Sequence, residues 1–173
     1  PDRVVAAGSV SKSLSPALRL GWLVVPRSLV VELGEIKANM DLGTATLPQA
    51  ALAHFITSGA MDRHLRRSRA RYRQRRDALV DTLRADVPNV RIEGIAAGLH
   101  VLIHLDPTQD ENLFTAHARD LGFTAQPLGR YRERPGPPGL VLGYGALTPE
   151  RIRAAAAHLG VQLRLLGAAH VDV

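Results

Sequence analysis

The segment that most constrains this chain is Gly8–Trp22, which reads GSVSKSLSPALRLGW. It is a turn rich in glycine, serine and proline between two apolar runs, and it holds Lys12, one of two lysines in a chain with twenty arginines. Arginine keeps its proton, whereas lysine can lose its proton and become an amine nucleophile. The lysine at this turn therefore indicates that an amine is needed there.

The neighbours of Lys12 suit a phosphate. Ser9, Ser11 and Ser13 supply hydroxyl groups, and Arg19 supplies a planar fork of N–H donors. A lysine beside phosphate-binding groups has three interpretations. It binds a phosphate as a cation, it holds pyridoxal phosphate by its aldehyde, or it is an exposed turn lysine without a functional role. A P-loop is excluded, because the spacing GxxxxGK[ST] does not occur here.

Composition limits the remaining possibilities. The 173 residues, 46% hydrophobic and 22% charged, are typical of a globular chain with one sizeable domain, or a small domain and part of another. The lack of cysteine excludes disulfides and thiolate sites. No apolar run approaches the ~20 residues that span a bilayer, and no signal peptide is recognisable, so we expect a cytoplasmic protein without membrane contact.

The positive charge is concentrated in one segment. Residues 62–84 hold nine arginines and three aspartates, which accounts for the whole formal charge of +6. The apolar positions recur at helical spacing, so we expect a packed helix with solvated arginines around an apolar stripe. Direct binding of DNA phosphates is the alternative.

Periodicity and turn residues predict a mixed helix and strand pattern. The expected strands are residues 3–7, 18–25, 90–93, 99–105, 123–127 and 140–144, and the expected helices are residues 26–39, 48–58, 60–85, 110–121 and 148–166. Residues 129–139 are expected to form a loop rich in proline, glycine and arginine. The later half of the chain thus predicts a small α/β domain, a sheet of about four strands with helices on one face.

A strand that begins almost at the first residue predicts that the chain is a fragment of a longer protein. We expect residues 1–45 to be the end of a different, larger domain, residues 46–166 to form the small domain, and residues 167–173 to be a tail.

Three blocks of the sequence resemble a known family. GSVSKSLSPALRLGWLVVP is similar to the SxSKxLxPxLRxGW segment of fold-type I pyridoxal-phosphate aminotransferases. GAMDRHLRRSRARYRQRRDAL, and AAGLHVLIHL with GLVLGYGAL, are similar in the same order to the aminotransferase-like domain of MocR-type regulators in the GntR superfamily. The resemblance implies the C-terminal part of such a protein: the α+β small domain with the last strands and helix of the large domain.

The resemblance implies roles for four residues. Lys12 matches the lysine that forms the internal aldimine with pyridoxal phosphate, and Ser9 and Arg19 match positions that contact the phosphate; Ser11 is a further phosphate candidate. The amine of Lys12 would have to be unprotonated to attack the aldehyde of the cofactor.

Two departures from the family pattern affect the expected activity. Val141 stands where the resemblance places the arginine that binds the substrate carboxylate in aminotransferases. Arg130, Arg132 or Arg134 in the nearby loop would have to replace it, unless the loop is merely solvated. The family's remaining cofactor contacts, and the winged-helix DNA-binding domain of the regulators, belong to sequence before residue 1. These 173 residues alone are therefore expected to bind little or no cofactor.

No metal site is expected. His100 and His104 share one face of an expected strand and could pair on a metal ion, but the sequence fixes no third ligand beside them, so a surface pair is the preferred interpretation.

Three functions follow from these observations. The preferred one is the effector region of a MocR-like regulator that senses pyridoxal phosphate, an amino acid or an amine. Such a protein would be a homodimer that reaches DNA only through a separate N-terminal domain. The alternatives are part of a true aminotransferase, in which Lys12 also moves the proton between Cα and cofactor, and a folded module with a purely structural role.

Overall fold

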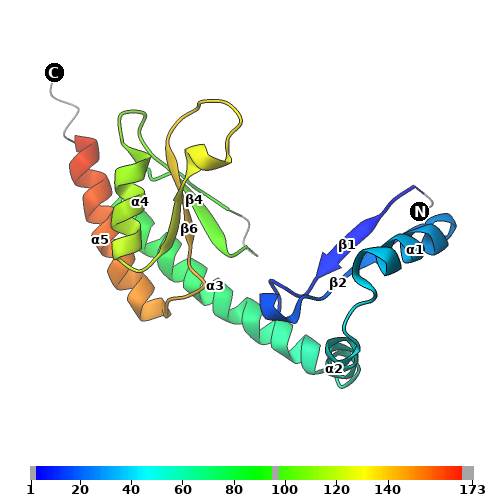
Figure 1. Ribbon diagram of the computed structural model, residues 1–173. Coiled ribbons are helices and arrows are strands. Elements are labelled where there is room, and N and C mark those ends of the chain that lie inside the picture. Colours follow the sequence, from blue (N-terminus) through cyan, green and yellow to red (C-terminus); the bar gives the residue numbers. More distant parts are fainter. Residues whose placement is uncertain (1–2, 95–97, 169–173) are drawn as a thin grey trace. The chain divides into compact units, whose positions relative to one another are not determined.

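The computed structural model describes residues 3–94 and 98–168, and it divides the chain into two compact units, Pro1–Arg66 and Arg67–Val173 (Figure 1). The expected domain boundary between residues 45 and 46 falls inside the first unit, and the domain division of a longer protein stays a prediction. Of the expected tail, Gly167 and Ala168 continue the last helix, and residues 169–173 lie outside the described part.

A short hairpin forms the beginning of the first unit. Strand β1 (Ala6–Ser9) pairs antiparallel with β2 (Gly21–Val24), from Ala6 opposite Val24 to Ser9 opposite Gly21. Both strands are shorter than the expected residues 3–7 and 18–25, and β1 ends later than expected. The second strand starts late because Pro16–Leu18 forms a 3-10 turn and Arg19 takes a left-handed backbone angle, φ 51°.

Two helices follow the hairpin. Helix α1 (Val30–Asp41) is preceded by a 3-10 turn at Arg27–Leu29, and α2 spans Thr46–Thr57. The expected first residue of α2, Pro48, lies inside its first turn, where a missing N–H leaves no helical hydrogen bond broken.

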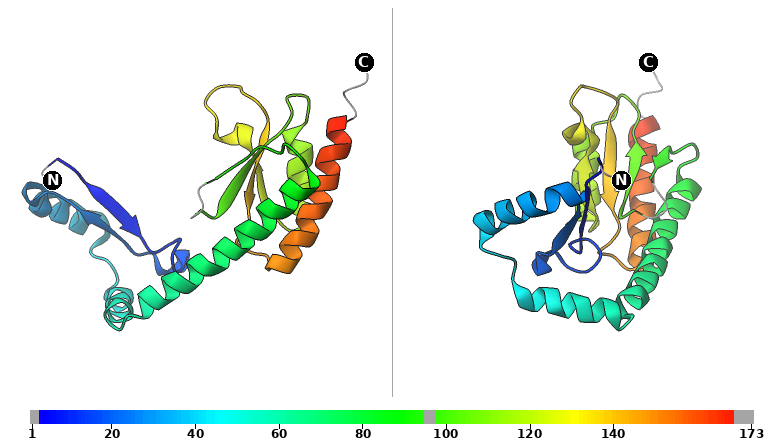
Figure 2. Two further views of the ribbon diagram at one scale, coloured as in Figure 1. Left: turned by 180° about the vertical axis from the view of Figure 1, so that it is seen from behind. Right: turned by 90° about the vertical axis from the view of Figure 1, so that its right-hand side faces the viewer.

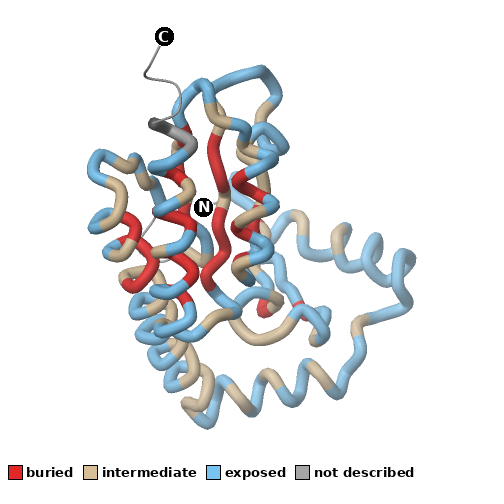
Figure 3. Tube along the Cα trace, turned by 90° about the vertical axis from the view of Figure 1, so that its left-hand side faces the viewer, coloured by how far each residue is buried: buried red, intermediate tan, exposed pale blue. Residues whose placement is uncertain are grey.

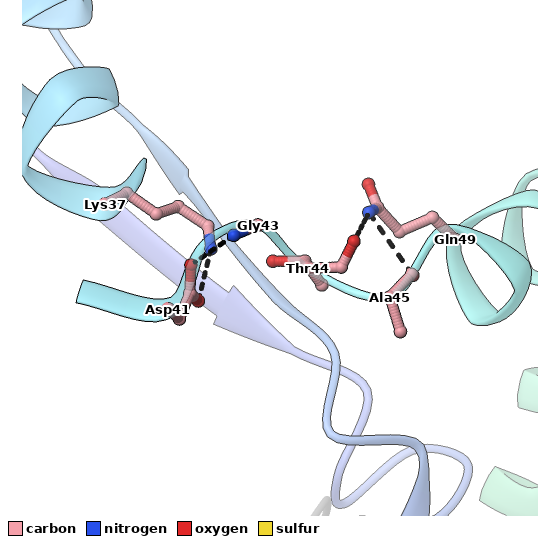
Figure 4. A network of polar contacts seen from close by, with 6 residues as sticks. All are labelled: Lys37, Asp41, Gly43, Thr44, Ala45 and Gln49. Atoms are coloured by element: carbon pink, nitrogen blue, oxygen red, sulfur yellow. Dashed lines mark hydrogen bonds and ion pairs between the residues drawn. The ribbon is translucent and has the colours of Figure 1, made fainter. Parts of the chain in front are cut away.

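The link between α1 and α2 is held by polar contacts (Figure 4). Lys37 Nζ donates to Asp41 Oδ2 at 2.6 Å, the Gly43 N–H donates to Asp41 Oδ1 at 3.0 Å, and Gln49 Nε2 donates to the Thr44 carbonyl at 3.0 Å. The hydrogen bond from Lys37, and then the one from Gly43, hold the pKa of Asp41 below its ordinary value.

The first unit buries little of its apolar surface. Among its described residues only Val10, Leu20 and Pro26 are buried. Large apolar side chains stay exposed along the hairpin and the two helices: Val4, Val5, Trp22, Leu23, Val24, Val30, Val31, Ile36, Met40, Leu42, Leu47 and Ile56. Figure 3 shows the contrast, because the buried segments gather in the second unit.

The long basic helix is confirmed as α3 (Ala60–Asp86).

The sheet of the second unit has four strands in the order β3-β4-β6-β5, and all neighbouring pairs are antiparallel. Its elements are β3 (Ile92–Glu93), β4 (His100–His104), α4 (Glu111–Asp120), β5 (Thr124–Pro127), β6 (Gly139–Gly143) and α5 (Pro149–Ala168). The expected loop contains a 3-10 turn at Leu128–Tyr131.

The core of the second unit lies between the sheet and its helices. Alternate residues of β4, such as Val101 and Ile103, are fully buried, and their partners on β6 are Leu142 and Leu140. Buried side chains of α3, α4 and α5 pack against this one face (Figures 1 and 2). The mixed fold with helices on one face is thus confirmed. None of the helices within residues 3–94 and 98–168 is long and apolar enough to cross a membrane.

Candidate functional site

The turn that carries Lys12 is a closed loop at the end of the hairpin. The Val10 N–H donates to the Leu20 carbonyl at 3.2 Å, one step beyond the last strand pair. Both side chains are buried, Val10 to 1% and Leu20 to 7% exposure, so they anchor the loop to the unit. Lys12 and Arg19 lie between these two anchors.

Internal hydrogen bonds shape the loop. The Leu14 N–H donates to the Val10 carbonyl at 2.8 Å, and the Ser11 N–H donates to Ser9 Oγ at 3.0 Å. Ser9 Oγ acts there as an acceptor, so its own hydroxyl proton can still be donated to a ligand. The left-handed conformation of Arg19 ends the 3-10 turn and leads the chain into β2.

Lys12 and Arg19 are both exposed, and neither side chain has a hydrogen bond or ion pair within the part of the chain that the structure describes. The other lysine differs, because Lys37 is held by Asp41. The loop therefore presents one amine and one guanidinium that no side-chain contact within residues 3–94 and 98–168 engages.

Residues that sequence reasoning missed support this loop. A ring nitrogen of His64, on α3, lies 2.8 Å from the Ser13 carbonyl oxygen, and the ring of Phe55 lies 6.4 Å from that of His64. An apolar cleft of about 450 Å³ lies beside the loop, lined by residues that include Leu14, Leu52 and Phe55 but not Lys12. His64 is 51 residues from Ser13, and no periodic signal links the two.

The donor set of the loop fits pyridoxal phosphate. A phosphate dianion would find the guanidinium of Arg19 and the hydroxyls of Ser9 and Ser11, and the aldehyde would find the amine of Lys12. Ser9 ends β1, and Ser11, Lys12 and Arg19 belong to the loop that follows, so all four lie in one short segment of the first unit. Their roles stay predictions.

The predicted substrate residues lie in the second unit. Arg130 Nη1 donates to Gln126 Oε1 at 3.1 Å. Arg132 lines a groove of about 730 Å³ together with Arg91, His104 and other residues. Val141 is half-buried on β6, opposite Gln126 on the neighbouring strand. A carboxylate-binding role for Arg130 or Arg132 stays a prediction.

The two histidines of β4 lie in different surroundings. His100 is exposed, whereas His104 Nε2 lies 3.2 Å from Glu93 Oε1. Hydrogen bonds from Arg91, and then from His104, lower the pKa of Glu93. Within residues 3–94 and 98–168, no three side chains of histidine or acidic residues gather as a metal site.

Comparison with known proteins connects this arrangement to a family. The family described as aminotransferase class I and II matches residues 1–159. The chain is 36% identical over 163 residues to YhdI, an uncharacterized HTH-type transcriptional regulator of Bacillus subtilis. The aligned region covers 92% of this chain and 34% of YhdI. It is 31% identical over 153 residues to the probable rhizopine catabolism regulatory protein MocR of Rhizobium meliloti, covering 87% and 31%.

A solved structure agrees with these relatives. LysN, the α-aminoadipate aminotransferase of Thermus thermophilus, complexed with N-(5'-phosphopyridoxyl)-L-leucine, superposes with a TM-score of 0.80 at 28% identity, over 96% of this chain and 43% of LysN. The chain spans only about a third of the length of the regulators YhdI and MocR. The match to the family over residues 1–159, together with the likeness to LysN, shows that this chain belongs to the aminotransferase class I and II family.

Proposed function

We propose that this chain is the C-terminal part of a pyridoxal-phosphate-binding, aminotransferase-like effector domain in a transcriptional regulator. The observation that carries the proposal is the loop at residues 10–20, which presents Lys12 and Arg19 exposed and, among the described residues, without a side-chain hydrogen bond or ion pair. The regulators among the relatives favour an effector role over catalysis.

Ser9 at the end of β1 and the residues of the loop would divide the work of binding. Arg19, Ser9 and Ser11 would hold the phosphate of the cofactor, and the amine of Lys12 would hold the cofactor through its aldehyde group. When bound, pyridoxal phosphate supplies an aldehyde that an amino compound can compete for, and an electron sink for carbanion chemistry.

A role as part of a true aminotransferase is the second candidate, favoured by the likeness to LysN. An enzyme of this kind must fix the substrate carboxylate, and Val141 offers no charge where the family resemblance places an arginine. Arg132, which lines a groove and has no ion pair among the described residues, is then the replacement to test first, with Arg130 next.

The proposed protein works in the cytoplasm as a homodimer and reads its DNA sequence through a separate helix-turn-helix domain. The exposed apolar side chains of the first unit are consistent with burial in a larger assembly. An amino acid or amine effector acts by binding one domain arrangement more tightly than the other.

The cofactor proposal is tested by titrating the full-length protein with pyridoxal phosphate and recording the visible absorption of a lysine-bound cofactor. Lys12→Ala is expected to abolish the band. Lys37→Ala is the matched control, because it removes the only other lysine of these 173 residues, and it should leave the band unchanged. A band that survives in Lys12→Ala contradicts the proposal.

Regulation and catalysis are then separated with the same protein. A regulator is expected to change its affinity for a DNA fragment from its own promoter when pyridoxal phosphate or an amino acid is added, and to show no steady-state transamination. Multiple turnovers with unchanged DNA affinity would instead favour the enzyme.

A further inference from the structure

The groove that Arg132 lines lies in the second unit, where β4 ends and β6 begins. It measures about 730 Å³, and its walls come from the segment after α3, the segment after β4, the loop before β6, and α5. More than half of its lining residues are apolar, among them Val90, Leu105 and Leu163. A cavity of this size with apolar walls and a few polar groups is typical of small-molecule sites.

Hydrogen bonds join the walls of the groove to one another. The Leu105 N–H donates to the Pro138 carbonyl at 3.1 Å, which ties the end of β4 to the loop before β6. Gln109 Nε2 donates to the Leu163 carbonyl of α5 at 3.2 Å, and Gln109 Oε1 accepts the Asp106 N–H at 2.8 Å. The groove is therefore formed by the chain itself, without a ligand.

Arg132 differs from the other half-buried arginines of the second unit. Arg75 Nη1 donates to the Gly145 carbonyl at 2.6 Å, and Arg76 Nη1 lies 2.8 Å from Asp77 Oδ1. Arg132 is half-buried as well, but its side chain has no hydrogen bond or ion pair within residues 3–94 and 98–168. A charge that is partly removed from water is costly unless an opposite charge or an acceptor compensates it. An anion in the groove would supply that compensation.

The surroundings of Arg132 make room for its guanidinium. The Arg132 N–H donates to the Gly129 carbonyl at 3.2 Å, which fixes the backbone at the end of the 3-10 turn. A Cβ added at Gly136 would collide with Nη1 of Arg132 and would lie 3.0 Å from its Cζ. Gly136 thus leaves free the space that the guanidinium occupies.

The other charges of the groove select a ligand with a single negative charge. Arg91 is already paired, because its Nη2 lies 2.6 Å from Glu93 Oε1. Asp106 adds a negative charge to the lining, and it would repel a phosphate dianion. The planar fork of Arg132 suits the two oxygens of a carboxylate, and the apolar walls suit a hydrocarbon body.

We propose that this groove binds a small monocarboxylate with an apolar body, whose carboxylate is held by Arg132. The inference goes beyond the proposed function, because all residues that carry it lie in the second unit and none belongs to the cofactor loop. It also differs from the catalytic role considered for Arg132, since the ligand binds without pyridoxal phosphate and is not transformed.

The test titrates the full-length protein, without added cofactor, with 4-methylpentanoate in an isothermal titration calorimeter. This compound has a branched apolar body, and it has no amine or keto group that could react with the cofactor or with a lysine. Arg132→Gln is expected to weaken binding roughly ten- to a hundredfold, because a charged hydrogen-bonded pair is lost. Arg134→Gln removes an exposed arginine from the same loop and should leave the affinity unchanged.

Two further measurements examine the geometry and the charge separately. Gly136→Ala keeps the charge of Arg132 but displaces its guanidinium, so it should also weaken binding, and it serves as the test if Arg132→Gln does not fold. The neutral 4-methylpentanamide should bind roughly tenfold more weakly than the carboxylate, or less tightly still.

No binding of 4-methylpentanoate to the wild type, or equal losses in Arg132→Gln and Arg134→Gln, overturns the proposal. Equal affinity for the amide overturns the choice of a carboxylate. Binding that is lost in Arg19→Gln and kept in Arg132→Gln would place the anion at the cofactor loop and would also overturn it. Lys12→Ala should lose the cofactor band and keep its affinity for 4-methylpentanoate, so this proposal and the proposed function fail independently.

Discussion

Gly8 shows how one small residue permits the packing of the only tryptophan. The two residues face each other across the hairpin, and a Cβ at Gly8 would lie 2.4 Å from two ring atoms of Trp22. Trp22 is 51% exposed, so the ring can move aside at little cost. Gly8→Ala is therefore expected to shift the fluorescence maximum of Trp22 to longer wavelength, with the hairpin otherwise kept.

Gly34 provides the control for that substitution. It lies within α1, and a Cβ there would meet nothing within 4 Å. Gly34→Ala should leave the fluorescence maximum unchanged and stabilise the helix by about 0.5 to 1 kcal/mol, because alanine loses less backbone entropy in a helix. An equal spectral shift in both variants would contradict the packing of Trp22 on Gly8.

Tyr144 links stability to alkaline pH. Its ring is fully buried and its hydroxyl donates to the Gly98 carbonyl. Burial raises the pKa of this phenol above its ordinary value of 10.0, so the unfolded chain ionises first. The resulting stability is present below pH 10 and is lost as the pH rises through the higher pKa of the folded state.

In Tyr144→Phe the free energy of unfolding should therefore fall less steeply above pH 10 than in the wild type, as measured by denaturant titrations. At neutral pH the same variant should be less stable by about 1 kcal/mol, because the hydrogen bond of the hydroxyl is lost. Tyr131→Phe is the control, since that side chain is exposed. The same alkaline slope in wild type and Tyr144→Phe would show that another group is responsible.

Glu111 joins three elements of the second unit. Its carboxylate, in the first turn of α4, accepts the Gly129 N–H at 3.0 Å and the Gly139 N–H at 3.0 Å. It thus ties the helix to the 3-10 turn after β5 and to the first residue of β6. Hydrogen bonds to a charged acceptor are stronger than those between neutral groups.

Glu111→Ala is expected to lower the free energy of unfolding by roughly 1 to 3 kcal/mol, because two backbone N–H groups lose their acceptor. Glu133→Ala, in the exposed loop nearby, should change it by less than about 0.5 kcal/mol. Chemical denaturation measures both, and equal effects would contradict the anchoring role of Glu111.

The sequence predicted the elements better than the contacts between them. Helix α3 and the strands of the second unit follow from periodicity, because residues on a buried face recur at fixed spacing. Contacts such as Glu111 with Gly139, 28 residues away, depend on how elements pack, and no local pattern records them. The candidate loop was found because its residues are contiguous, whereas His64, which contacts it, belongs to a distant helix.

The two units differ in how far each can stand alone. The main core cluster, from Ala78 to Leu163, lies entirely in the second unit, whereas the first unit leaves most of its apolar side chains exposed. Limited proteolysis of the 173-residue chain is expected to remove the first unit and to leave a resistant product that starts within α3 and retains α5. Mass spectrometry identifies the product, and cleavage within β4 or β6 at an equal rate would contradict a separate core.

Lys12 is the residue proposed to hold pyridoxal phosphate. Borohydride reduction of the full-length protein after incubation with the cofactor fixes the bond permanently, and peptide mapping then locates the pyridoxyl group. We predict a single major site at Lys12, with none at Lys37. A label at Lys37, labelling spread over many lysines, or no label at all would contradict the claim.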